Sequence, residues 1–458
     1  MVILRCISLL LACLLSCVAQ AQEWRPITTQ TKLSNGLTVV LSEDHSAPTV
    51  GLCLSYGIGS RLEPQGRSGF AHLFEHMMFE GTPAAPKGIF ERVLESGGGV
   101  NNAETDSDFT QYYESAPISA LDAILWLEAD RMKTLDFSSR NLDNQRSVVE
   151  EEVRVSVLNQ PYGLFYFVDL PAKAFDKFPN SHNGFGNFKD LDAASIEDVR
   201  HFYELYYAPN NAVLAIVGDF SADELLAKIQ KYFSAVPSRS TPRHPDVSEG
   251  PQTAERRLTQ SDRLAKVPAL AIGYRMPPRT SSEAVVGALV GELLHNGQAS
   301  RLYRKLVKES QVAISVAGGL NFTGTNPFEY NGPTLLTSFI VYPKDTTQEQ
   351  VLQAYDAVIA DLAARRPPDE ELSRIRAKMR SDWYAQLEIP FARAQALSHA
   401  TLLDGGFERA YAIPEEVSRV TSDEVRAFVA KYLSRTNRTI INRVPERAKT
   451  PDAAGDPK

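Results

Sequence analysis

The feature that most restricts the fold is a helix–turn–strand pattern that occurs twice, near the end of each half of the chain. Ser195–Phe220 reads SIEDVRHFYELYYAPNNAVLAIVGDF, and Thr421–Glu446 reads TSDEVRAFVAKYLSRTNRTIINRVPE. Such units can look alike by chance, but their equivalent placement in two halves of similar length favours duplication of one domain. The segments align without a gap, with identical residues at Val199 and Val425, Arg200 and Arg426, Phe202 and Phe428, Tyr206 and Tyr432, and Asn211 and Asn437.

Length and hydrophobic pattern agree with two domains. A chain of 458 residues is too long for one ordinary core and suits two domains of roughly 200 residues each. Leu37–Glu43 and Thr49–Gly57 alternate or run apolar as strands do, and Leu121–Lys133 has apolar residues at helical spacing. Ala235–Arg257 carries four prolines among polar residues and reads as an extended linker. We therefore predict an α+β fold.

The expected boundaries follow from the linker. The first domain should span residues 25–235 and carry the chemistry described below. The linker should span residues 236–257 and the second, related domain residues 258–447. The polar tail, residues 448–458, should be disordered.

The first residues have the pattern of a secretory signal peptide. Arg5 gives a positive start, Cys6–Leu15 is apolar, and Ala19-Gln20-Ala21 fits a small-x-small cleavage site. We therefore expect cleavage of residues 1–21 after Ala21, and a periplasmic or secreted protein. A retained membrane anchor is one alternative, although the apolar stretch is short for a span. Lipid attachment at Cys17 is another, although Leu15 is bulky for that kind of cleavage box.

Cleavage after Ala21 would remove Cys6, Cys13 and Cys17 and leave only Cys53. The mature chain could then form no internal disulfide. Cys53 lies in an apolar run without a cationic neighbour in sequence. We expect it to be a buried small hydrophobe and not a reactive thiol.

The chemistry of the chain is concentrated in one H-x-x-E-H motif. The segment after Gly69 reads as a helix, on which His72 and His76 are four residues apart. Their imidazoles therefore project from the same side, one turn apart, and can bind one tetrahedral metal ion. Glu75 lies beside the pair and can reach a metal-bound water without being a ligand. The motif is the inverzincin signature, and with eight histidines in the chain its expected chance count is about 0.01.

The alternative interpretation of this motif is a surface helix with two ordinary histidines. Apolar side chains, and not a solvated charge pattern, flank the pair: Phe70, Leu73, Phe74 and Met77. This pattern favours a metal site over a solvated helix face.

A catalytic zinc site usually has three protein ligands and an open position for water, so a third ligand is needed. A helix predicted over Leu142–Leu158 carries three consecutive glutamates. Glu152 shares a helix face with Val148 and Val149, whereas the first of the three glutamates has mostly polar neighbours. Glu152 is the predicted ligand, and Glu151 is the next candidate.

Together these residues predict a hydrolytic mechanism. Zinc, one ion per chain, lowers the pKa of bound water from about 15.7 toward about 7. Glu75 takes a proton from that water as it attacks a peptide carbonyl and then delivers the proton to the leaving amine. The metal also polarises the carbonyl and stabilises the developing oxyanion.

The motif and its surroundings resemble the pitrilysin/insulinase (M16) family of zinc peptidases, in particular its half-length branch of mitochondrial processing peptidases and bacterial relatives. The resemblance covers nearly the whole mature chain. It implies two related domains that form half of a clamshell, each with an antiparallel-rich sheet packed with helices. It also implies a glutamate ligand in a Val-x-x-Glu context, which Val149–Glu152 matches. The matching stretches are Gly57-x-Gly59-Ser60-Arg61 and Gly69-x-Ala71-His72-x-x-Glu75-His76-Met77-x-Phe79-x-Gly81-Thr82.

The resemblance implies further site residues. Seven positions before the ligand, where the family has an accessory glutamate, this chain has Gln145, which could keep a hydrogen bond without the charge. Asn102, Ala103 and Thr105 resemble an edge strand near the zinc, which implies main-chain pairing with an extended substrate. An ordinary edge strand explains these residues equally well.

The second half departs from the zinc pattern. It has no H-x-x-E-H motif, and Glu292–His295 is not a substitute. Where many relatives carry an arginine and a tyrosine that contact substrate, this chain has Val307 and Ile314. Half-length relatives form two-chain clamshells, so the resemblance implies a homodimer, or a heterodimer with a related chain that supplies those contacts.

These observations predict a zinc metalloendopeptidase acting on peptides or unfolded polypeptide segments. A net charge of -8 gives no electrostatic reason to expect nucleic acid as a partner, and no integral membrane span is expected in the mature form. One alternative is a non-catalytic or partner-dependent subunit of a two-chain processing peptidase. Another is a peptide-modification maturase that shares the chemistry. The complete predicted ligand set favours an active enzyme.

Overall fold

The computed structural model describes residues 24–446, except residues 243, 322, 323 and 325. The predicted signal peptide, with Cys6, Cys13 and Cys17, and the predicted tail lie outside the described residues. Secretion, cleavage after Ala21 and lipid attachment at Cys17 therefore stay predictions. In the described part of the chain, no helix is long and apolar enough to cross a membrane.

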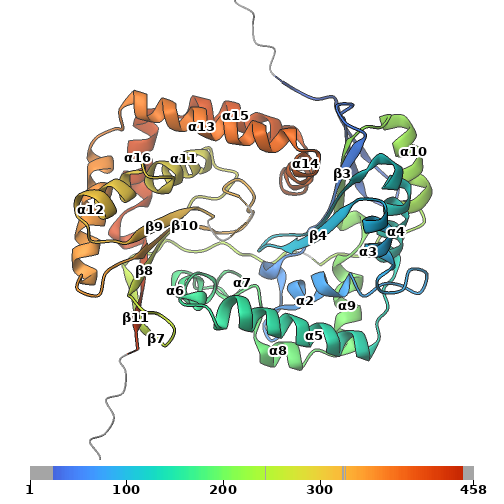
Figure 1. Ribbon diagram of the computed structural model, residues 1–458, viewed down its shortest axis with the longest axis horizontal. Helices are drawn as coiled ribbons and strands as arrows, with labels where there is room; N and C mark the ends of the chain where they lie inside the picture. Colours follow the sequence, from blue (N-terminus) through green and yellow to red (C-terminus); the bar gives the residue numbers. More distant parts are fainter. Residues whose placement is uncertain (1–23, 243, 322–323, 325, 447–458) are drawn as a thin grey trace, which may run out of the picture.

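The first half is built on a six-stranded sheet (Figure 1). Only β2 and β6 run parallel, and the other neighbouring strands pair antiparallel. Among the described residues, β4 forms one edge of the sheet and has β5 as its one neighbouring strand. In spatial order the strands are β1 (Thr28–Lys32), β2 (Thr38–Glu43), β6 (Ala212–Gly218), β3 (Thr49–Tyr56), β5 (Thr110–Pro117) and β4 (Val100–Thr105).

Helices of the first half pack against one face of this sheet and share a hydrophobic core with it. The predicted helix over 121–133 is confirmed with the same bounds, and the one over 142–158 is α5 followed by a π-helical turn, Arg154–Leu158. The helices are α2 (Phe70–Met77), α3 (Ile89–Ser96), α4 (Leu121–Lys133), α5 (Ser139–Val153), α6 (Leu170–Ala174), α7 (Phe178–Ser181), α8 (Phe188–Asp192), α9 (Ile196–Tyr206) and α10 (Ala222–Phe233).

The second half repeats the plan with a five-stranded sheet and longer helices. Its strands, in spatial order, are β7 (Arg256–Asp262), β11 (Arg438–Pro445), β8 (Ala269–Arg275), β10 (Leu335–Val341) and β9 (Ser315–Leu320). Its helices are α11 (Glu283–His295), α12 (Gln348–Ala364), α13 (Asp369–Glu388), α14 (Pro390–Asp404), α15 (Glu408–Arg419) and α16 (Ser422–Tyr432). The predicted α+β class, with two related mixed domains, is confirmed.

The internal repeat extends to individual hydrogen bonds. Helices α9 and α16 both begin with a capping box. The N-cap side chain accepts a hydrogen bond from the backbone N–H three residues later, and the side chain of that later residue accepts one from the N-cap backbone N–H. The strands that follow, β6 and β11, each pair with one strand in parallel and another antiparallel. Asn211 and Asn437, matched in the sequence alignment, each donate a side-chain hydrogen bond to the tyrosine carbonyl five residues before. Two matched asparagines in one structural role support duplication.

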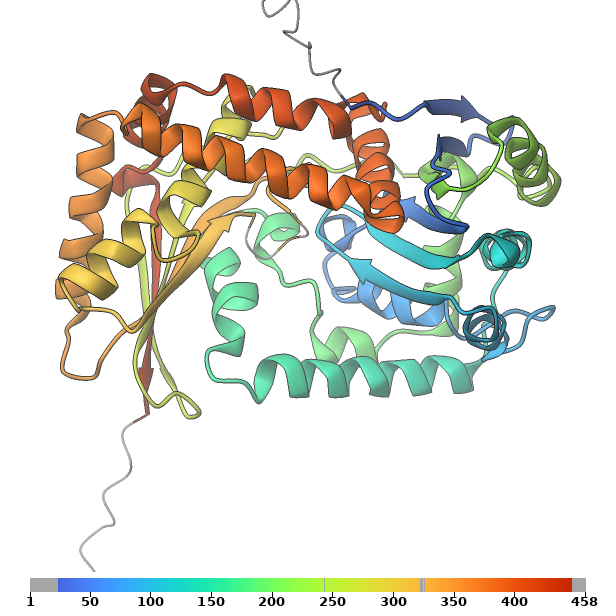
Figure 2. The same ribbon diagram turned by 45° about the horizontal axis from the view of Figure 1, so that its top comes forward.

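The two halves exchange helices across their sheets. Helix α14 of the second half packs on β3 and β6 of the first, where it lies between the two sheets in Figures 1 and 2. In return, Phe165 and Leu170 of the first half join a cluster with Ala271 and Ile441 of the second sheet. Because these cores contain residues of both halves, the described chain is one packed unit and not two independent domains.

Cys53 lies in β3 under α14 and is fully buried. Burial raises the pKa of its thiol to about 12. The prediction of a buried, unreactive thiol is confirmed.

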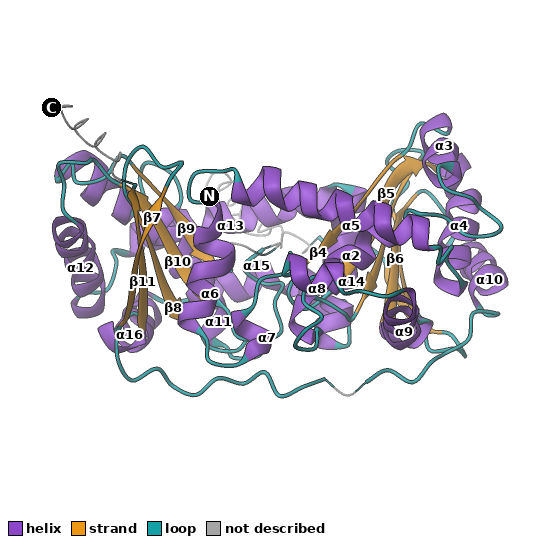
Figure 3. Ribbon diagram, turned by 90° about the horizontal axis from the view of Figure 1, so that it is seen from below, coloured by secondary structure: helices purple, strands orange, loops and turns teal. Residues whose placement is uncertain are grey.

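Between α10 and β7 the described residues form neither helix nor strand. Figure 3 shows this segment as a long loop running along one side of the molecule from one sheet to the other. Its course agrees with an extended, proline-rich linker, while the domain boundaries stay predictions.

Candidate metal and substrate site

The H-x-x-E-H segment forms α2, and its start is fixed by a remote carboxylate. Gly69 precedes the helix in the left-handed region, with φ of 86°, and offers no capping side chain. Glu63 takes that role, because it accepts hydrogen bonds from the backbone N–H groups of Gly69 and Ala71 at 2.8 and 2.7 Å. Burial raises the pKa of Glu63, although His182, with its Nε2 3.1 Å from the carboxylate, and the two amides favour the charged form.

One face of α2 anchors it in the core and leaves the other for chemistry. Phe70, Leu73, Phe74 and Met77 are buried, and the Phe74 ring packs at a tilt against the rings of Phe202 and Tyr207. This packing aims His72, Glu75 and His76 away from the core, as the spacing predicts.

The structure brings three donor side chains together. Nε2 of His72 and Nε2 of His76 are 3.3 Å apart. Glu152, from α5, places its carboxylate oxygens 3.2 Å from Nε2 of His76 and 3.7 Å from Nε2 of His72. Among the described residues, this is the cluster of such donors that could hold one metal ion.

The donor set fits zinc. Tetrahedral ligands bonded at about 2.0–2.2 Å lie about 3.4 Å from one another, close to the distances between these three side chains. Burial lowers the pKa of His72 to about 4, so its imidazole is neutral at pH 7. A hydrogen bond to His76 holds the pKa of Glu152 below its usual value, so this carboxylate is ionised.

Glu75 faces the same space without joining the donor cluster. It accepts a hydrogen bond from the Thr105 hydroxyl at 2.6 Å, from the end of strand β4. Burial raises the pKa of Glu75, against the opposing effect of this hydrogen bond. A raised pKa is suited to a group that takes up and releases a proton near neutral pH.

Gln145 lies behind the metal-facing side of His76. Burial lowers the pKa of His76, but Glu152, Glu75 and, to a smaller extent, the Gln145 side chain raise it. The Nε2 of Gln145 donates to the buried carboxylate of Glu80. Lys87 pairs with the same Glu80 oxygen. Gln145 therefore lies between a candidate ligand histidine and a buried carboxylate, and its role near the metal stays a prediction.

The three consecutive glutamates have different surroundings. Glu150 and Glu151 both pair with Arg154 and lie outside the donor cluster. Val149 is fully buried as expected, but Val148 is 41% exposed. The prediction that Val148 and Val149 share a buried face with Glu152 is therefore right for Val149 and wrong for Val148, which faces solvent.

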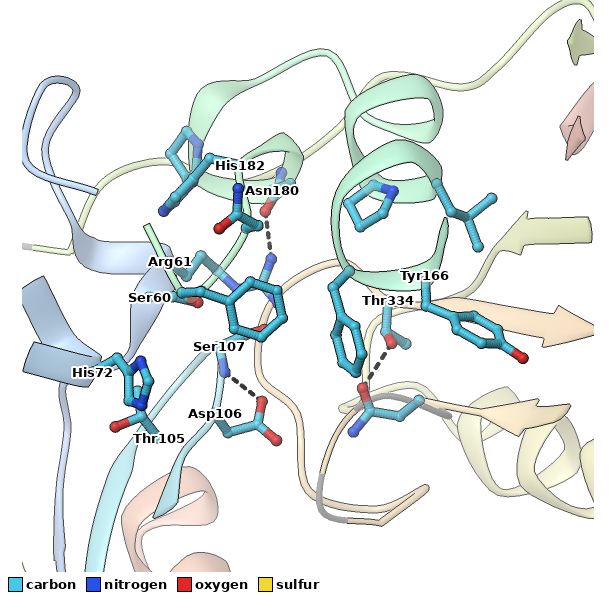
Figure 4. A pocket seen from close by; sticks show the side chains of 18 of the residues that line it. Ser60, Arg61, His72, Thr105, Asp106, Ser107, Tyr166, Asn180, His182 and Thr334 are labelled. Carbon is cyan, nitrogen blue, oxygen red and sulfur yellow. Dashed lines mark hydrogen bonds between the residues drawn. The ribbon is translucent and has the colours of Figure 1, made fainter. Parts of the chain in front are cut away.

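A cleft of about 400 Å³ opens beside the donors and is lined by both halves. In Figure 4, His72 and Thr105 lie on one side, Tyr166 and Thr334 on the other, and Asp106 between them. Apolar side chains from the segment after α5 face the cleft, including Tyr166, Phe167, Leu170 and Phe185.

The remaining candidate residues fall in different places. Ala103 and Thr105 line the cleft, and Asn102 does not. Strand β4 is the edge strand, as the resemblance implies. Val307 packs against the second core, and Ile314 is 52% exposed; neither is a cleft residue. His295 is buried in that core, where its Nε2 forms a hydrogen bond with the Ser338 hydroxyl, and it is not part of the donor cluster.

Sequence reasoning missed an ion pair of the first half, here called the clasp, that binds backbone groups of the second half at the cleft. Arg61 pairs with Asp108 at 2.8 Å, and both are buried. Arg61 also donates to the Pro333 carbonyl, and Asp108 accepts from the backbone N–H of Asn331 and Gly332. No periodicity marks such residues, because they lie in turns and their partners are remote in sequence.

Comparisons with known proteins find matches for both halves of the chain. A family model described as Insulinase (Peptidase family M16) matches residues 38–182, and one described as Peptidase M16 inactive domain matches residues 193–379. The chain is 29% identical to the zinc protease PqqE of Helicobacter pylori over 64% of this chain and 66% of that protein. It is 28% identical to a probable mitochondrial-processing peptidase subunit beta of Arabidopsis thaliana, over 47% of this chain and 40% of that one.

Among solved structures, a protease from Helicobacter pylori has the same fold. The TM-score is 0.86 at 23% identity, and the match covers 92% of this chain and all of that one. The likeness in fold thus extends over both halves of the chain.

Proposed function

The chain belongs to the M16 peptidase family, and from this premise we propose that it is an active zinc endopeptidase that cleaves peptides or unfolded polypeptide segments. The observation that carries the proposal is the meeting of His72, His76 and Glu152 beside Glu75 at a cleft. The second family model is described as inactive, but it begins after all four of these residues, which lie in the range of the first model.

His72, His76 and Glu152 would hold the ion. Zinc in this position would acidify a water molecule and polarise the peptide carbonyl. Glu75 accepts the proton of the attacking water and passes it to the departing amine. The Thr105 hydroxyl, bonded to Glu75 at 2.6 Å, holds the carboxylate in position for both transfers.

The edge of the first sheet would hold the substrate. An extended peptide can add to β4, whose outer edge is unpaired in the sheet, through main-chain hydrogen bonds. Folded proteins rarely expose such a segment, so peptides and unfolded stretches are the expected substrates.

Two variants test the chemistry. Wild type should carry about one zinc per chain, and His76→Ala should lose it. Glu75→Gln should keep zinc and lose about 10²–10⁴-fold in kcat on a quenched peptide. Glu95→Gln, on an exposed position of α3, is the matched control. If Glu75→Gln cleaves as fast as the control, Glu75 is not the base.

A partner-dependent enzyme is the second candidate. The Arabidopsis relative is named as one subunit of a processing peptidase, and Val307 and Ile314 supply no cleft contact here. We propose a homodimer or a heterodimer with a related chain as the active form. Light scattering of the purified mature chain during peptide cleavage tests this, and a fully active monomer would contradict it. A maturase would show the same zinc content but act on one particular peptide.

A further inference from the structure

The edge strand β4 has two faces of different character. On the face toward α2, Ala103 is buried and Thr105 bonds Glu75. Glu104 points to the opposite face, where it lies across from Gln111 of β5 and accepts a hydrogen bond from its amide at 3.1 Å. The same Gln111 side chain bonds Gln395 of α14, so Glu104 faces the side of the sheet that α14 covers.

The surroundings of Glu104 hold an excess of negative charge. The cleft is lined by four carboxylates and a single guanidinium, that of Arg61, which is already paired with Asp108. On the α14 side, His399 is paired with Glu329 at 2.9 Å. Within the described residues, Glu104 makes no ion pair of its own.

Asp106 adds a second carboxylate just after the end of β4. It lies two residues beyond Glu104 and lines the same cleft, between the two halves in Figure 4. With Glu75 and Glu152 assigned to the reaction, Glu104 is the cleft carboxylate on β4 itself that can contact a substrate side chain.

A substrate strand added to β4 would present its side chains alternately to the two faces. Side chains next to the residue that faces the metal would therefore meet the Glu104 face. Directly opposite side chains on paired strands have Cβ atoms about 4.5–5.5 Å apart, within reach of a lysine or arginine.

From this placement, and resting on the proposed endopeptidase function, we infer that Glu104 is a specificity-determining residue. It selects a substrate lysine or arginine one position away from the residue that faces the reaction centre. A charge-assisted hydrogen bond in a half-buried cleft should give a preference of roughly tenfold in kcat/KM for lysine over glutamine.

The test is a lysine scan. One lysine is moved through a neutral quenched peptide, with glutamine at the same position as reference, and kcat/KM ratios are measured for the zinc-loaded protein. Wild type should favour lysine at one position by roughly tenfold. Glu104→Gln should remove that preference, and Glu104→Lys should favour glutamate at the same position. Glu95→Gln should behave as wild type. Because each value is a ratio, a general change in Glu75 reactivity cancels.

The outcomes separate the two proposals. Cleavage without a lysine preference, or a preference that survives in Glu104→Gln, overturns the role of Glu104 and leaves the endopeptidase intact. A preference lost in Asp106→Asn but kept in Glu104→Gln also overturns it. Absence of cleavage of every peptide by zinc-loaded wild type overturns the proposed function and this inference together. Zinc content and thermal midpoint equal to wild type show that each variant is folded.

Discussion

At the scale of single residues, a buried carboxylate outside the donor cluster, that of Glu80, is linked to the surroundings of His76 through the Gln145 amide. Gln145 lies beside His76, whose pKa it helps to raise against the effect of burial, and donates a hydrogen bond to the buried Glu80 carboxylate. A ligand histidine that donates its second ring N–H is fixed in tautomer and orientation. Here the Glu80 carboxylate is not in direct contact with the histidine. It accepts a hydrogen bond from the Gln145 amide, which transmits the polarisation toward His76.

This arrangement predicts that Glu80 tunes metal affinity. Glu80→Gln should weaken zinc binding by about tenfold, within the 10–100-fold range for outer partners of metal ligands. The swap Glu80→Gln with Gln145→Glu should restore the affinity, because the charge then contacts His76 directly. Competition with a fluorescent zinc chelator measures the affinity without reference to activity.

Glu95→Gln, at an exposed position of α3 that does not line the cleft, is the matched control for removing one negative charge. Equal zinc affinity in Glu80→Gln and the control would show that Glu80 serves only to pair Lys87.

At the scale of elements, α2 depends on a contact from outside the helix. Its start has no capping side chain of its own, and Glu63 bonds two backbone N–H groups there. Glu63→Gln should lower the free energy of unfolding by about 2–3 kcal/mol, because an amide replaces a charged acceptor in a buried site. Urea unfolding of the zinc-free protein measures this without the contribution of the metal. A loss below about 0.5 kcal/mol, the range of ordinary surface substitutions, would contradict the capping role.

Elements with clear periodicity were predictable, and contacts between distant segments were not. Apolar spacing predicted β2, β3, α4 and the metal helix, because burial of one face decides those structures. The spacing of His72 and His76 predicted a shared direction. The capping by Glu63 and the clasp of Arg61 with Asp108 join turns that only the tertiary fold brings together. Val148 shows the limit of a face argument, since an apolar residue on α5 can still face solvent.

At the scale of the whole molecule, the two halves hold each other through exchanged helices. Helix α14 approaches β3 so closely at Gly51 that an added Cβ would lie 2.2 Å from the backbone nitrogen of Phe391. Gly51→Ala should therefore lower the free energy of unfolding by about 3 kcal/mol or more. Gly250→Ala, where a Cβ meets open space, should leave stability nearly unchanged. Similar thermal midpoints for both variants would contradict tight packing between the halves.

The clasp between Arg61 and Asp108 makes the free energy of unfolding depend on pH. Burial would raise the pKa of Asp108, but the Arg61 charge and hydrogen bonds from Asn331 and Gly332 outweigh it and hold the pKa below its usual value. A carboxyl with a lowered folded pKa stabilises the fold above its unfolded pKa of about 3.9, and this contribution is lost as the pH falls through the folded value. Asp108→Asn lacks the contribution at every pH. The difference in unfolding free energy between wild type and Asp108→Asn should therefore be largest near neutral pH and shrink below about pH 4.

Denaturant unfolding from pH 7 down to pH 3 measures this difference directly. Asp143→Asn is the matched control, because Asp143 also pairs with an arginine but its side chain is 68% exposed, where such pairs contribute little. A wild-type advantage over Asp108→Asn that stays constant with pH would mean that the Asp108 charge does not hold the halves together. The loop with Asn331 and Gly332, which leads into the cleft residue Pro333, would then be held by packing alone.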